Sequence, residues 1–225
     1  MPPTSTRESS ELWKSNDPAA WRAALGEYHT RMAALNNPEL EKLDRWFHDK
    51  LPGLIAARTP KHMSSEELVM LVDWKMTRGK RRPNLLKWAQ EHKPETVLKA
   101  TSAAIAVLTA AGTKKGIVAI ENIPSALKPL VDLKGVGPAT ASAVLAAADD
   151  SLPWMSDDII AVAAPTTSSK DAYSEQRYLA VVDAVRAKAA KVGLTAREVE
   201  RAVYSEAART KKPKKAPVAG KKRKR

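Results

Sequence analysis

The chain contains no cysteine among its 225 residues. This absence excludes disulfide bridges, thiolate zinc sites, cysteine-bound iron–sulfur clusters and cysteine nucleophiles, and it favours an intracellular protein. The sequence also lacks any apolar run close to the roughly 20 residues that a membrane-spanning helix needs, and its polar start lacks the apolar segment of a signal peptide. We therefore expect a soluble protein without a membrane partner.

Positive charge is concentrated at the C-terminal end. The formal net charge is +13, and ten Lys or Arg residues without any acidic residue fall within 209–225, so the preceding 208 residues carry only +3. A cationic tail that neutralises phosphates releases counterions and gives salt-sensitive, sequence-independent affinity for nucleic acid. The runs KKPKK and KKRKR also fit a two-part nuclear localisation signal, and both roles can coexist. We expect a nuclear protein.

Hydrophobic periodicity predicts an all-α fold. Apolar residues recur at spacings of three or four in most of the chain, and no segment shows sustained alternation. Ser64 and Glu67 form a capping box ahead of one such helix. We expect a disordered polar N-terminus over residues 1–16, a helical domain over 17–208 and a basic disordered tail over 209–225.

The segment LKPLVDLKGVGPATASAVL, residues 127–145, predicts two helices joined by a tight glycine turn. Gly135 and Gly137 allow positive φ and let the backbone approach a ligand closely. The N–H groups of Gly137, Ala139 and Thr140 would then lack helical partners and favour an anion such as phosphate. The alternative is a plain turn between two helices.

This pattern, with LKGVGPATA at its centre, resembles the helix-hairpin-helix of DNA repair proteins. Residues 64–165 resemble the DNA glycosylases of the endonuclease III type. The resemblance implies a two-lobed helical fold in which a hairpin over residues 127–148 contacts the backbone of duplex DNA without reading its bases. The implied contacts are Lys134, Gly135, Val136, Gly137, Ala139 and Thr140.

The same resemblance implies a catalytic aspartate. In that family an aspartate downstream of the hairpin stabilises the sugar cation that forms as the base leaves. Asp157 lies 18 residues after Ala139 and matches this place, while its neighbour Asp158 leaves a one-residue ambiguity. Asp157 could instead simply cap the helix that follows. No metal site is expected here, because no histidine or third carboxylate lies nearby at a suitable spacing.

Two departures from the family limit the chemistry. Bifunctional members carry a lysine where this chain has Ala139, so Schiff-base lyase chemistry at that position is not expected. The missing cysteines exclude an iron–sulfur cluster, and no cofactor is expected. The resemblance therefore implies a monofunctional DNA N-glycosylase. The alternative is a non-catalytic DNA-binding or scaffold module that retains the hairpin; the base removed and any protein partner stay open.

A basic segment, WKMTRGKRRPNLLKW, spans residues 74–88. Cations interleaved with tryptophans are typical of surfaces that bind phosphates and stack on bases. The two tryptophans could equally be core residues. Trp154, which precedes the aspartates, could likewise line a base pocket or pack in the core. The predicted phosphate contacts of this segment are Lys75, Arg78, Lys80, Arg81 and Arg82.

Overall fold

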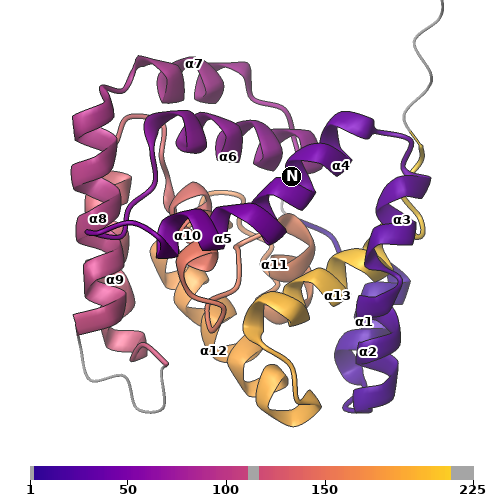
Figure 1. The fold of residues 1–225 in the computed structure, drawn as a ribbon. Coiled ribbons are helices and arrows are strands. Elements are labelled where there is room, and N and C mark those ends of the chain that lie inside the picture. The colour runs from indigo at the N-terminus through magenta and orange to yellow at the C-terminus, as the bar shows by residue number, and fades with distance from the viewer. Residues whose placement is uncertain (1–2, 111–116, 214–225) are drawn as a thin grey trace, which may run out of the picture.

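The computed structural model describes residues 3–110 and 117–213, which form helices joined by loops (Figure 1). This confirms the all-α prediction. In chain order the elements are α1 (Arg7–Lys14), α2 (Pro18–Gly26), α3 (Tyr28–Ala34), α4 (Pro38–Arg45), the π-helix η1 (Trp46–Lys50), α5 (Leu51–Ala56), α6 (Ser65–Arg78), α7 (Pro83–Glu91), α8 (Pro94–Ala110), the 3-10 helix η2 (Ile120–Asn122), α9 (Ile123–Val131), α10 (Pro138–Ala148), α11 (Asp157–Ala163), α12 (Glu175–Val192) and α13 (Ala196–Ala208). No helix in these described ranges is long and apolar enough to cross a membrane.

Residues 7–14 form helix α1, so the disorder predicted for the N-terminal segment, residues 1–16, is wrong for these positions. Thr6 caps α1 by accepting a hydrogen bond from the N–H of Ser9. Leu12 is only 8% exposed, and the indole of Trp13 packs edge-on against Trp21 of α2. A short polar segment gains enough burial to fold when α13 and α11 offer it an apolar surface.

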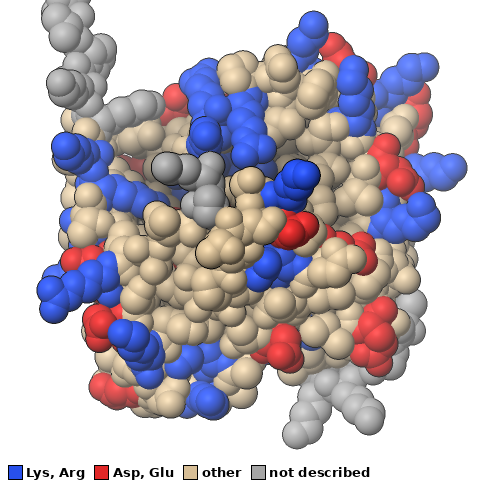
Figure 2. All heavy atoms as spheres, turned by 180° about the vertical axis from the view of Figure 1, so that it is seen from behind, with Lys and Arg blue, Asp and Glu red and all other residues tan. Residues whose placement is uncertain are grey.

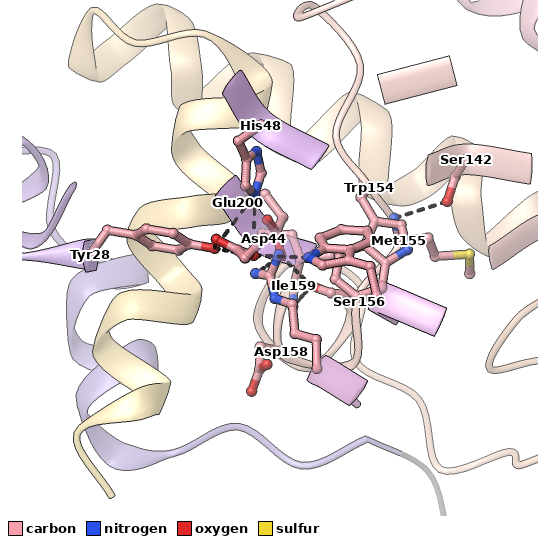
Figure 3. A network of polar contacts seen from close by, with 12 residues as sticks. Tyr28, Asp44, His48, Ser142, Trp154, Met155, Ser156, Asp158, Ile159 and Glu200 are labelled. Atoms are coloured by element: carbon pink, nitrogen blue, oxygen red, sulfur yellow. Dashed lines mark hydrogen bonds and ion pairs between the residues drawn. The ribbon is translucent and has the colours of Figure 1, made fainter. Parts of the chain in front are cut away.

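A single hydrophobic core connects α1 to α13. In the described residues the two expected lobes share this one core, and a cleft divides them at the surface. In the middle of this core Trp74 stacks on Phe47, with ring centroids 3.7 Å apart, and its Nε1 donates to the carboxylate of Asp44. Tyr28 donates to the same carboxylate (Figure 3). Trp74 is thus a core residue rather than a base-stacking platform.

Helix α10 occupies the centre of the fold and contacts α5, α6, α8, α9 and α12 (Figure 1). Its small residues make this possible: Ala141, Ala143 and Ala146 are fully buried, because side chains of this size let neighbouring helices approach closely. The N-terminus of α10 follows the glycine turn, residues 132–137, that joins it to α9. Dense packing along the rest of the helix fixes where that N-terminus lies.

Candidate functional site

A cleft of about 870 Å³ opens where three distant segments of the chain meet. One side is formed by the end of α6 and the loop after it, another by the glycine turn and the start of α10, and a third by residues 154–158. Of the residues predicted from the sequence, Arg81 is exposed outside the cleft. The others all line it: Lys75, Arg78, Lys80, Arg82, Lys134, Gly135, Val136, Gly137, Ala139, Thr140, Asp157 and Asp158.

The two glycines of the turn have different roles. Gly135 has a φ of +84°, and a Cβ there would lie 2.7 Å from Cε3 of Trp88, so this position needs glycine for both conformation and space. Gly137 has an ordinary φ of −92°, so it does not use the positive φ that glycine allows. A Cβ on Gly137 would meet nothing within 4 Å. Gly135 therefore packs against α7, whereas Gly137 borders open space.

The start of α10 presents backbone donors at the cleft that find no partner within the first turn of the helix. Gly137 is the N-cap residue, and its carbonyl accepts the N–H groups of Thr140 and Ala141, each at 2.9 Å. The predicted free amide of Thr140 is therefore engaged in this first turn. The amides of Gly137 and Ala139 have no partner within the helix, because the first turn of a helix leaves its donors unpaired. These two N–H groups and the positive end of the helix dipole favour an anion.

Asp157 is an exposed carboxylate at the first position of α11. The predicted alternative role as helix cap is wrong, since Ser156 takes it: its Oγ accepts from the N–H of Ile159. One carboxylate oxygen of Asp157 instead accepts a hydrogen bond of 2.7 Å from the hydroxyl of Tyr173. Burial, and then this bond, raise the pKa of Tyr173, so its hydroxyl remains a donor that orients Asp157.

Asp158 has a different environment from its neighbour. It is partly buried, and Lys211 pairs with it at 2.9 Å. The ammonium of Lys211 also lies 4.0 Å from the ring centroid of Tyr204. The charge of Asp158 is thus compensated by a fixed cation, and Asp157 is the carboxylate that faces the cleft without an ion-pair partner among the described residues.

The first residues of the basic tail belong to the folded domain. Arg209 pairs with Glu206 at 3.1 Å, and Lys211 contributes to the cleft. The prediction of a disordered tail is therefore wrong for these positions, because buried or partly buried carboxylates of α13 and α11 hold them. The greater part of the predicted tail, residues 214–225, lies outside the described residues.

Arg78 and Trp154 close the floor of the cleft. The side chain of Arg78 is 1% exposed and pairs with Glu200 at 2.8 Å, while its guanidinium lies over the rings of Trp154 and Tyr204. The prediction that Arg78 contacts phosphate is wrong, because the guanidinium is buried against aromatic faces and neutralised by a carboxylate. Trp154 is 5% exposed and donates through Nε1 to the carbonyl of Ala139. It is at once a core residue and part of the cleft floor.

Accessible cations also line the cleft. Lys80 and Arg82 are exposed, and the guanidinium of Arg82 lies 5.6 Å from the ring centroid of Tyr173. Lys134 lies over the indole of Trp88 and 3.7 Å from Glu91. Lys and Arg side chains gather in the upper part of the face that is turned away in Figure 1 (Figure 2). The cleft thus combines a cationic wall with the open carboxylate of Asp157.

Comparisons found no match for this chain among protein-family models, characterised proteins or solved structures. Its function is therefore inferred from its own residues. Within residues 3–110 and 117–213, no group of three or more histidine, aspartate or glutamate residues is arranged to hold a metal ion. Sequence reasoning missed Tyr173, which follows Asp157 by 16 residues in an irregular segment without a motif, and Lys211, which its basic neighbours assigned to the tail.

Proposed function

We propose that the protein binds duplex DNA across this cleft and removes a flipped base as a monofunctional N-glycosylase. The observation that supports the proposal best is convergence. A helix N-terminus with two unpaired amides, a cationic loop and an oriented, exposed carboxylate, Asp157, come from separate parts of the chain and line one cavity.

Binding would use the backbone of DNA. The amides of Gly137 and Ala139 suit one phosphate, and Lys80 and Arg82 suit phosphates on the other side of the cleft. These contacts position a protein on DNA without reading the base sequence. Lys134, whose ammonium lies over the ring of Trp88, adds a cation beside the glycine turn.

Base removal would use Asp157. A volume of about 870 Å³ accommodates an extruded nucleotide, since ligand cavities generally span about 300–1,000 Å³. As the glycosidic bond breaks, positive charge develops on the sugar, and a carboxylate held in place by Tyr173 stabilises that charge without having to reorganise. Water then completes the hydrolysis.

A non-catalytic DNA-binding module is the second candidate function. Ala139 favours it, because the residue at this position of the turn carries no reactive group. Both functions use the same DNA contacts, so affinity cannot separate them. Release of a free base from lesion-bearing duplex separates them: a glycosylase leaves an abasic product, and a binding module leaves the duplex intact.

The basic tail is expected to add phosphate contacts and to direct the protein to the nucleus. Ending the chain at Lys211 removes eight Lys or Arg residues but keeps the ion pair with Asp158. The slope of log K against log salt should then fall by several units, at about 0.9 per lost contact. Fluorescence anisotropy with a duplex over a salt series measures this, and unchanged helical circular dichroism serves as the control. An unchanged slope would leave the tail with a localisation role alone.

A further inference from the structure

We propose that Lys75 is an imine-forming residue: its amine captures an aldehyde that occupies the cleft. The inference rests on the proposed function for the identity of that aldehyde, which is the ring-opened sugar of an abasic site, the product of base removal. The amine comes from α6, on a different side of the cleft from Ala139. Imine formation by Lys75 therefore requires no residue of the glycine turn.

The position of Lys75 differs from that of the other cleft lysines. Lys134 pairs with Glu91 and Lys211 with Asp158, and Lys80 projects into solvent. Lys75 lies on the last turn of α6, partly buried in the cleft wall, and its Nζ has no hydrogen bond or ion pair to any described residue.

This environment favours the neutral, nucleophilic amine. Burial lowers the pKa of Lys75 to about 8, and the positive charge of Arg82 adds to the effect, while the negative charge of Asp157 opposes it. At pH 7 such an amine is neutral in about a tenth of the molecules, compared with fewer than about one in a thousand for an ordinary lysine. Lysines activated by desolvation are the ones that form Schiff bases.

The reaction is balanced without a further reactant. The nitrogen of Lys75 attacks the aldehyde carbon C1′, a carbon–nitrogen double bond forms, and the carbonyl oxygen leaves as water with the two protons of the neutral amine. Asp157 lines the same cleft and can accept and return the proton during addition and loss of water. The imine hydrolyses by the reverse path, so the protein would hold the abasic site covalently but reversibly.

Reductive trapping tests this proposal. The full-length protein is incubated with duplex that contains one abasic site, borohydride is added, and the adduct is quantified on a denaturing gel and mapped by mass spectrometry. We expect one DNA adduct at Lys75. Lys75→Arg keeps the positive charge but cannot form an imine, so adduct yield should fall at least tenfold while duplex affinity stays within about threefold. Lys87→Ala, an exposed lysine on α7 outside the cleft, serves as the matched control and should give the wild-type yield.

A second measurement separates this proposal from the function on which it rests. Reductive methylation with formaldehyde reports the reactivity of each amine without DNA, and we expect Lys75 to react at least tenfold faster than Lys87. If duplex binds but no adduct forms, or the adduct maps to another amine, the imine proposal is overturned and DNA binding stands. If Lys75 is methylated rapidly but duplex does not bind, the reactive amine is supported and the DNA function is overturned.

Discussion

Gly137→Glu is expected to lower the affinity for duplex DNA by roughly 30- to 100-fold. The substitution places a carboxylate where the unpaired amides of α10 would receive a phosphate, so it removes charge-assisted hydrogen bonds that contribute about 2–3 kcal/mol and adds repulsion. The fold should tolerate it, because Gly137 has an ordinary φ and a Cβ there meets nothing within 4 Å. Fluorescence anisotropy at fixed salt measures the affinity.

A glycine on α5 provides a matched control for Gly137→Glu. Gly53→Glu makes the same change of charge on α5, at an exposed glycine where a Cβ also meets nothing within 4 Å, and Gly53 does not line the cleft. Its affinity should stay within about twofold of wild type. Both variants should keep wild-type helical circular dichroism. Wild-type affinity for Gly137→Glu would remove the glycine turn from the DNA interface.

Asp157→Asn is expected to reduce base release by at least about a hundredfold while leaving duplex affinity within a few-fold of wild type. A carboxylate beside a developing sugar cation stabilises the transition state much more than bound DNA, so its loss should appear in the rate. Stability should change little, because Ser156 caps α11 and the asparagine oxygen can still accept from Tyr173. Single-turnover assays on a panel of damaged duplexes give the rate.

Asp158→Asn is the control for this variant. It alters the ion pair with Lys211 but leaves the Tyr173–Asp157 bond in place, so base release should stay near the wild-type rate. Loss of activity in Asp158→Asn alone would shift the assignment by one residue. If the wild-type protein releases no base from the whole panel, the non-catalytic module is the correct function.

The features that the sequence predicted correctly depend on short-range physics. Helix periodicity, the capping box at Ser64 and Glu67, and the positive φ of Gly135 all follow from residues within a few positions of one another. The predicted site residues also converge, with Arg81 alone outside the cleft. The packing of α10 against α6 brings the glycine turn close to the end of α6, and that contact is long-range.

The features that it could not predict depend on distant partners. The basic residues around Arg78 in the sequence are typical of an exposed cation. In the structure its guanidinium is buried and paired with Glu200, 122 residues away. Residues 7–14 are polar by composition, yet α13 offers them an apolar surface. Tyr173 reaches Asp157 from a segment without periodicity. In each case the deciding contact joins residues whose spacing carries no local signal.

Hydrogen–deuterium exchange of the wild-type chain with and without duplex DNA shows directly whether DNA occupies the cleft. If DNA occupies the cleft, the amides of residues 79–82 and 135–140 should exchange more slowly in the complex, while α5, on which the control glycine lies, should be unaffected. Protection confined to residues 212–225, with no change around Gly137, would show that DNA does not occupy the cleft, because the tail alone would then hold the DNA.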